Sequence, residues 1–174
     1  MPNRVSRGAV SGGYIHAKAW LAQILIGDAW ARTQAGEEQA RPWPWADTWP
    51  VARLEVPRLG AAMTVLAGGS GRTMAFGPGH VDGPARPGEI GVSLSSGHRD
   101  THCRLLEELR LGDAIDIEDR AGKRHHFRVT AMAVVDGRRV RIDTNADTPR
   151  HAPSCSTTAR GFESTPIVLV HEMW

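Results

Sequence analysis

The stretch that decides the fold and around which the chain is organised is SSGHRDTH at Ser95–His102. The β-favouring run Ile90–Leu94 leads into it, and the helix-favouring run Arg104–Leu109 follows it. A glycine before a histidine at a strand end lets the backbone approach closely and places an imidazole at the rim of a sheet. The alternative interpretation is a solvated loop that carries two surface histidines, His98 and His102.

The composition of this 174-residue chain is typical of one soluble globular domain with an additional N-terminal segment. Hydrophobic residues make up 41% and charged residues 23%. The 19 glycines and 11 prolines indicate many turns and therefore favour a β-rich fold. The net charge of +2 comes from scattered basic residues without a long run, so we expect no nucleic-acid partner.

The N-terminal part is predicted to be a loose segment followed by one helix. Met1–Gly13 is small, polar and basic, and Tyr14–Ala35 is alanine-rich without proline. The apolar middle of this helix either packs on the domain or lies at a membrane surface. The longest apolar stretch, Ala19–Gly27, is well short of the roughly 20 residues that span a bilayer. Met1–Gly13 also lacks the pattern of a secretory signal, so we expect neither a signal peptide nor a membrane span.

A polar break at Gly36–Ala40 gives the domain boundary, with residues 1–40 as the N-terminal segment and helix and residues 41–174 as the β domain. The next segment, Arg41–Pro50, holds three tryptophans between prolines. Because proline fixes φ and lacks an N–H group, this segment is predicted to be an extended arm. We expect its tryptophans to lie across the domain as a buried strap, and the alternative is an exposed aromatic binding surface.

From Val51 onward the hydrophobic period is that of strands and turns. Single helical turns are expected at Thr73–Phe76 and Leu105–Leu109. Closely spaced strands with so little helix suggest a small closed β-barrel or a sandwich. The predicted strands are Val51–Val56, Ala62–Leu66, Gly88–Leu94, Ala114–Asp119, His125–Val135 and Pro166–His171.

One histidine after a strand and one cysteine late in the chain form the strongest candidate for chemistry. His98 and Cys155 are 57 residues apart (155 − 98), so only the fold could bring them together. A thiol with a pKa near 8.5 is a poor nucleophile at neutral pH, and a nearby imidazolium favours the thiolate. The same imidazolium can then protonate a leaving amine, while a third group, usually cationic, holds the carbonyl oxygen of the substrate.

The other cysteine, Cys103, is best interpreted as a small buried residue, although one disulfide with Cys155 is also permitted. A metal site made by His98, His102 and Cys103 would need the two histidines to share a helical face, and His98 is expected to precede the helix. The neighbouring histidines His125 and His126 should point to opposite faces of a strand. We therefore expect no metal and no cofactor.

Four segments resemble the sortase family, most closely the group found in Gram-negative bacteria, often called class GN. The Pro-Trp segment and the Gly-His-Arg-Asp-Thr-His segment are together specific to it. The resemblance spans roughly residues 14 to 136, and its segments are Tyr14–Gln23, Pro42–Leu54, Phe76–His80 and Gly97–His102.

The resemblance implies a mainly β, sortase-like closed β-barrel with short helices and an N-terminal helix. It implies a cysteine transpeptidase that cleaves a C-terminal sorting signal of LPXTG type, forms a thioacyl-enzyme and passes the acyl group to an amine. The partners would be a substrate protein with that signal and an amine acceptor, and the location the cell envelope, with the domain in the periplasm. By position, His98 matches the catalytic histidine, Cys155 the nucleophile and Arg160 the arginine.

Residues 137–165 depart from the family pattern. The family's nucleophile ends an apolar strand, whereas Pro149 and Pro153 precede Cys155 and argue against a central strand there. The family's arginine lies on the next strand, whereas Arg160 follows Cys155 by only five residues (160 − 155). A non-catalytic sortase-like domain that binds a peptide or a protein partner is therefore the alternative function.

Overall fold

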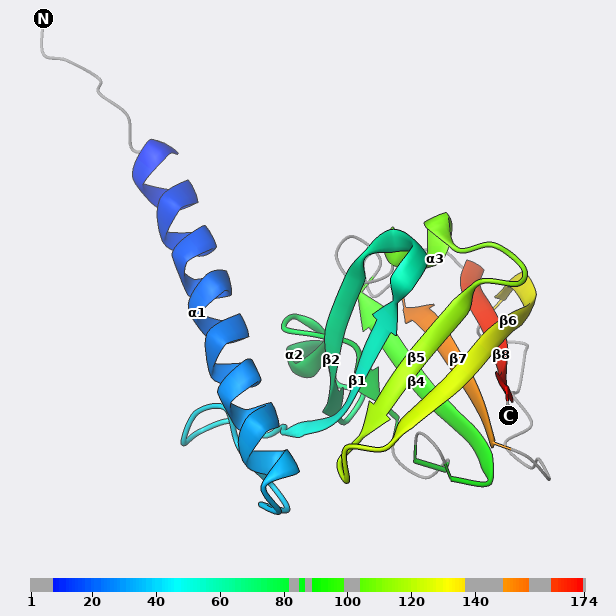
Figure 1. The fold of residues 1–174 in the computed structure, drawn as a ribbon. Coiled ribbons are helices and arrows are strands. Elements are labelled where there is room, and N and C mark those ends of the chain that lie inside the picture. Colours follow the sequence, from blue (N-terminus) through cyan, green and yellow to red (C-terminus); the bar gives the residue numbers. More distant parts are fainter. Residues whose placement is uncertain are drawn as a thin grey trace, which may run out of the picture.

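A long helix leads into a curled β-sheet in the computed structural model of this chain (Figure 1). The structure describes the backbone of residues 8–81, 85–86, 89–98, 104–136, 149–156 and 164–173, and side chains at 17–81, 85–86, 89–97, 105–133 and 150. Within these ranges the elements are α1 (Gly8–Gln34), β1 (Pro50–Val56), η1 (Pro57–Leu59), β2 (Ala61–Ala67), α2 (Gly71–Met74), β3 (Gly79–His80), β4 (Gly91–His98), α3 (Arg104–Glu108), β5 (Ala114–Asp119), β6 (Arg124–Asp136), β7 (Pro149–Ser156) and β8 (Ser164–Met173).

The strands pair in the order β1-β2-β3-β4-β7-β8-β6-β5, and β5 pairs back with β1, so that the sheet curls round into a barrel. Two of the strand pairs are parallel, β2 with β3 and β4 with β7. The other pairs in the described strands are antiparallel. The prediction of a mainly β fold with a curled sheet is confirmed. Parallel pairing of β4 with β7 makes both strands end at the same edge of the sheet.

The core follows from the alternation of apolar and polar residues along the strands. Every second residue of β1 is buried, and Ile115 and Ile117 of β5 are fully buried. Side chains two residues apart on a strand lie on the same face of the sheet, so these residues meet inside the barrel. Leu106 of α3 packs in the same cluster. The main cluster comprises Ala52, Leu54, Val56, Val65, Leu106, Leu109, Ile115, Ile117, Phe127 and Val129.

Helix α1 begins at Gly8 rather than at Tyr14, so the expectation of a loose segment is wrong for residues 8–13. Once a helix has formed, each further residue that joins it gains a backbone hydrogen bond. Residues 8–13 can therefore extend α1 although they include glycine and serine. The helix ends at Gln34 because Gly36 takes a φ of 103°, a conformation that L side chains rarely adopt.

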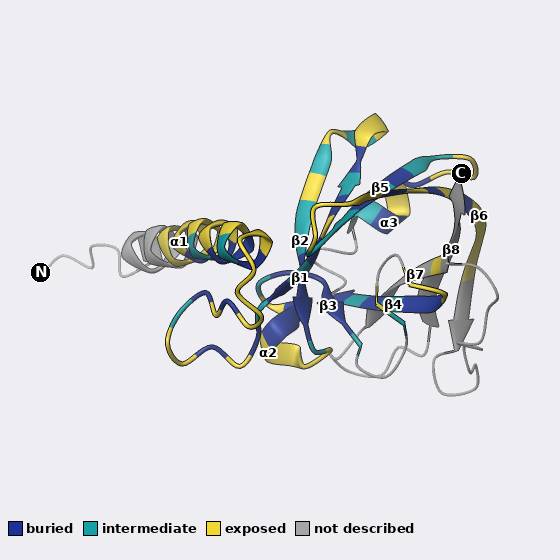
Figure 2. Cartoon of the chain, turned by 60° about the horizontal axis from the view of Figure 1, so that its bottom comes forward, coloured by how far each residue is buried: buried dark blue, intermediate teal, exposed yellow. Residues whose placement is uncertain are grey.

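The C-terminal half of α1 packs on the molecule, while the part before it extends away from the barrel in Figures 1 and 2. Ile26 and Trp30 are buried, whereas Trp20, Leu21 and Ile24 are exposed. In the part of the chain that the structure describes, none of the helices has the combined length and apolar character needed to span a membrane.

The Pro-Trp arm is only partly buried: the expectation of a buried tryptophan strap is wrong for Trp45, and Trp43 and Trp49 are half-buried. Trp45 is 82% exposed. Trp43 packs edge-on against Phe76, with 5.0 Å between ring centroids. Thr48 Oγ1 donates to the Ala67 carbonyl oxygen over 2.6 Å, which ties the end of the arm to β2. The arm is therefore fixed by its ends and exposes its middle.

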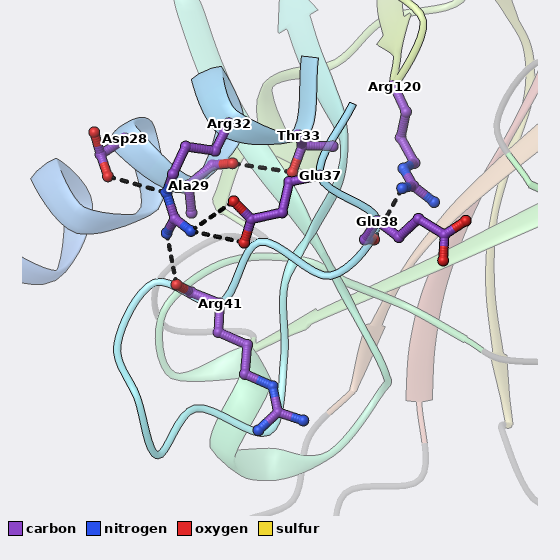
Figure 3. Close-up of polar contacts among 8 residues, drawn as sticks. All are labelled: Asp28, Ala29, Arg32, Thr33, Glu37, Glu38, Arg41 and Arg120. Atoms are coloured by element: carbon purple, nitrogen blue, oxygen red, sulfur yellow. Dashed lines mark hydrogen bonds and ion pairs between the residues drawn. The ribbon is translucent and has the colours of Figure 1, made fainter. Parts of the chain in front are cut away.

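Polar contacts fix the junction between α1 and the arm (Figure 3). The Arg32 guanidinium donates to the Asp28 carboxylate over 3.3 Å, to both Glu37 carboxylate oxygens over 2.8 and 3.0 Å, and to the Arg41 carbonyl oxygen over 2.7 Å. Arg120 donates to the Glu38 carbonyl oxygen from the turn between β5 and β6. These bonds connect the helix end, the polar break and the barrel.

Candidate active site

The candidate site lies where β4 and β7 end side by side. These parallel strands pair residue by residue, from Gly91 with Pro149 to His98 with Ser156. In this register Gly97 lies opposite Cys155. The fold thus brings the backbones of His98 and Cys155 to adjacent positions at one edge of the sheet, although the two residues are far apart in the sequence.

His98 is the last residue of β4, so the prediction that His98 lies after the strand is wrong. The expected strand ends at Leu94, before the Ser95–His102 segment, in which Gly97 has low β propensity. Pairing with β3 and β7 on the two sides extends β4 through these residues. Since glycine has no side chain, the position opposite Cys155 on β4 adds no bulk beside the candidate nucleophile.

Strand β7 is an internal strand of the sheet, so the expectation that its prolines would prevent such a strand is wrong. It pairs with β4 over all eight of its residues and with β8 on its other side. The β7–β8 pairs in the described strands are Arg150–His171, His151–Val170 and Ser154–Ile167, which include neither Pro149 nor Pro153. Each proline lacks an N–H group and so removes one possible hydrogen bond to a neighbouring strand. The remaining pairs with β4 and β8 keep β7 in the sheet.

A row of small, buried residues continues the site across β3 and β4. Ser93, Ser95 and Gly97 lie on one face of β4 and are all buried. His80 of β3 pairs with Ser95 and is itself buried, with its Nδ1 atom 3.1 Å from the Leu94 carbonyl oxygen. No pattern in the sequence gave His80 a role of its own; the available signal was a histidine directly after the Gly-Pro-Gly segment that ends the predicted helical turn.

The remaining predicted site residues lie outside the described residues. Arg160 follows β7 in the range 157–163, and His102 and Cys103 precede α3. The side chains of His98 and Cys155 are likewise outside the described part. Strand β8 has the sequence STPIVLVHEM and therefore carries no arginine.

Histidines elsewhere behave as the strand alternation predicts. The side chain of His125 is 3% exposed and that of His126 is 54% exposed, which confirms that they point to opposite faces of β6. His125 pairs with Asp119, and His126 with Asp116. Among the residues that the structure describes, no group of three or more histidine, cysteine, aspartate or glutamate side chains could hold a metal ion.

The family follows from comparison with known proteins. The family model described as "Sortase domain" matches residues 54–159, a segment that contains both His98 and Cys155. The match covers more than half of the chain, and the chain therefore belongs to the sortase family.

Individual relatives agree with this assignment. The chain is 30% identical to Sortase D of Bacillus subtilis (strain 168) over 98 residues, which are 56% of this chain and 47% of that protein. It thus spans about half the length of the curated relative that it matches.

Solved structures share the fold. Sortase A from Corynebacterium diphtheriae has a TM-score of 0.65 at 21% identity, covering 75% of this chain and 63% of that one. A Clostridium perfringens sortase D5 transpeptidase also has a TM-score of 0.65, at 19% identity, covering 85% of this chain and 89% of that one. Sortase E from Streptomyces avermitilis has a TM-score of 0.63 at 24% identity, covering 72% of this chain and 88% of that one.

Proposed function

We propose that this protein is a cysteine transpeptidase of the Gram-negative sortase group. It would cleave a C-terminal sorting signal of LPXTG type through a thioacyl-enzyme and transfer the acyl group to an amine. The observation that carries this proposal is that β4 and β7 end side by side, which brings the backbones of His98 and Cys155 to the same end of the sheet. Membership of the sortase family supports the reaction class.

In the proposed reaction the Cys155 thiolate attacks the carbonyl carbon of the scissile peptide bond. The His98 imidazolium gives its proton to the leaving amine as the C–N bond breaks, which leaves a thioester on Cys155. The acceptor amine then attacks the thioester and loses a proton to His98, and the Cys155 thiolate leaves. Arg160 would hold the carbonyl oxygen as negative charge develops on it.

The proposed location is the cell envelope, with the barrel in the periplasm. The exposed apolar residues Trp20, Leu21 and Ile24 of α1 make this helix the element that would lie closest to a membrane surface. The substrate partner would be a protein with the sorting signal, and no nucleic acid is involved.

The first test is alkylation of the full-length protein across pH, with Cys155 and Cys103 quantified separately by mass spectrometry. We expect Cys155 to react fast near neutral pH, because a paired imidazolium favours the thiolate. His98→Ala should slow this reaction at least about tenfold, since the thiol then returns to a pKa near 8.5. Cys103 serves as the internal control, and its rate should not depend on His98.

Two results would contradict the proposal. One is a Cys155 rate that is ordinary for a thiol and unaffected by His98→Ala. The other is activation of Cys103 in place of Cys155, which would move the nucleophile to the other cysteine.

The absence of arginine from β8 favours a second candidate, a non-catalytic sortase-like domain that binds a peptide or a protein partner. Without a cation at the oxyanion, a thiol–imidazole pair would lose a large part of its transition-state stabilisation. Incubation with a sorting-signal peptide distinguishes the two candidates. Thioacylation of Cys155 supports the enzyme, whereas saturable binding without any covalent adduct supports the binding domain.

A further inference from the structure

His80 is a buried, titratable residue beside the candidate site to which the proposed reaction gives no role. It is 6% exposed and lies on β3, next to β4. Its Nδ1 atom is 3.1 Å from the Leu94 carbonyl oxygen. Because a carbonyl oxygen only accepts hydrogen bonds, Nδ1 carries the hydrogen and donates it.

The Leu94 carbonyl joins β4 to β3 through two hydrogen bonds. One comes from the His80 ring, and the other from the Val81 backbone N–H group over 2.9 Å. Strand β3 has only two residues, which pair as Gly79 with Ser96 and His80 with Ser95. The imidazole therefore adds a side-chain hydrogen bond to a strand contact of only two residue pairs.

This contact lies immediately before the end of β4. Ser95 is opposite His80 on one side and Pro153 on the other, and two residues later Gly97 is opposite Cys155. Ser95 and Gly97 share a buried face of β4. In the described strands, the pairs that β4 makes beyond Ser96 are with β7. The His80 bond thus holds β4 against β3 just before β4 reaches His98.

We propose that His80 is a positioning residue that holds the end of β4 in the register in which Gly97 and His98 lie opposite Cys155 and Ser156. It acts through the Nδ1–H bond to the Leu94 carbonyl oxygen. This structural role of the His80 bond does not depend on the proposed function. Only the expected effect of the bond on the reactivity of Cys155 rests on that function.

The test compares three substitutions in the full-length protein: His80→Asn, His80→Gln and His80→Ala. An asparagine amide places an N–H group where Nδ1 lies, whereas a glutamine amide reaches the position of Nε2. Two quantities are measured, the alkylation rate of Cys155 and hydrogen exchange of the β4 amides over residues 93–98.

We expect His80→Asn to stay close to wild type in both measurements. His80→Ala and His80→Gln should accelerate β4 exchange at least about fivefold, which corresponds to the net loss of one hydrogen bond. They should also slow Cys155 alkylation by up to as much as His98→Ala does, about tenfold, because a displaced His98 no longer favours the thiolate.

His125→Ala is the matched control for general loss of stability. His125 is also buried and also bonded through its ring, with Nε2 2.9 Å from Asp119 Oδ2. It lies on β6, which β7 and β8 separate from β4 in the sheet. This substitution should lower the melting temperature and leave the Cys155 rate and exchange over residues 93–98 unchanged.

The outcomes separate the two proposals. Unchanged β4 exchange in His80→Ala overturns the positioning role, and so does rescue by glutamine instead of asparagine. Accelerated exchange with an unchanged, His98-dependent Cys155 rate also overturns it. If His98→Ala does not affect wild-type Cys155, the transpeptidase proposal fails, and the exchange data alone then decide whether His80 braces β4.

Discussion

At the scale of single residues, glycine decides how closely the chain packs around β3. A Cβ atom at Gly79 would overlap the Gly68 carbonyl oxygen, and one at Gly77 would lie 2.8 Å from the Thr64 carbonyl oxygen. Neither glycine is among those with positive φ in the structure. The requirement at these two positions is therefore space for neighbouring backbone and not an unusual backbone conformation.

Gly79→Ala should destabilise the protein by about 1–3 kcal/mol, the usual cost of forcing extra volume into a packed region. The measurement is urea denaturation of wild type and variant. Gly27→Ala is the control, because Gly27 lies within α1 and a Cβ atom added there would meet no neighbouring atom within 4 Å. It should stabilise by up to about 1 kcal/mol through helix propensity. Equal midpoints for Gly79→Ala and wild type would show that β3 can move away from Gly68.

At the scale of elements, one ion pair joins η1 to the turn between α3 and β5. Arg58 donates to both Asp113 carboxylate oxygens over 2.7 Å and also to the Glu108 carbonyl oxygen at the end of α3. The Asp113 carboxylate accepts the Arg110 backbone N–H group as well. The Arg58 hydrogen bond lowers the pKa of Asp113 below its ordinary value, although partial burial opposes this shift.

The lowered pKa of Asp113 predicts a pH-dependent contribution to stability. The unfolded chain binds this proton more readily than the folded chain, so the contribution is present above the ordinary aspartate pKa of about 4. It is lost as pH falls through the lower, folded-state pKa. Asp113→Asn should therefore destabilise the protein at pH 7, and the difference from wild type should shrink in acid. Denaturation curves between pH 7 and acid conditions provide the measurement.

The Arg58→Ala background is the control for this ion pair. Asp113→Asn should have a smaller effect there, because the substitution removes a carboxylate that has already lost its partner. A pH-independent effect of Asp113→Asn would contradict the lowered pKa of Asp113, because both the Arg58 bond and the Arg110 amide bond favour its ionised form.

At the scale of the whole molecule, polar contacts join the end of α1 to the arm and the barrel. Arg32 connects Asp28, Glu37 and the Arg41 carbonyl oxygen (Figure 3). In addition, Gln34 donates to Glu118 of β5 over 2.8 Å. These groups are exposed, so each pair adds little stability. We expect that together they limit the angle at which the projecting part of α1 leaves the barrel.

Arg32→Ala should broaden the range of α1 orientations while changing the melting temperature little. The measurement is the distance distribution between spin labels at Ala17→Cys and Lys123→Cys, in a chain whose two native cysteines are replaced by serine. Arg41→Ala is the matched control, because the bond from Arg32 uses the Arg41 carbonyl oxygen and not its side chain. An unbroadened distribution in Arg32→Ala would mean that apolar packing of Ile26 and Trp30 alone sets the helix direction.

Local patterns in the sequence determined much of the fold. The predicted strand Ala114–Asp119 agrees with β5 at both ends, and the turn at Ala121–Gly122 joins it to β6 as expected. Alternation over short distances contains this information, because each side chain of a strand faces either the core or the surface. The sequence also indicated His98 and Cys155 as the candidate pair, and their roles remain predictions.

Tertiary pairing decided what the local patterns left open. Prolines at 149 and 153 predict no internal strand, yet β4 and β8 hold β7 between them. The same pairing extended β4 as far as His98 and set Gly97 opposite Cys155. Propensity describes a residue in isolation, whereas hydrogen bonds from two neighbouring strands act on the whole segment and outweigh it. Which residues meet at the candidate site is therefore a property of the curled sheet as a whole, and no stretch of the sequence contains it alone.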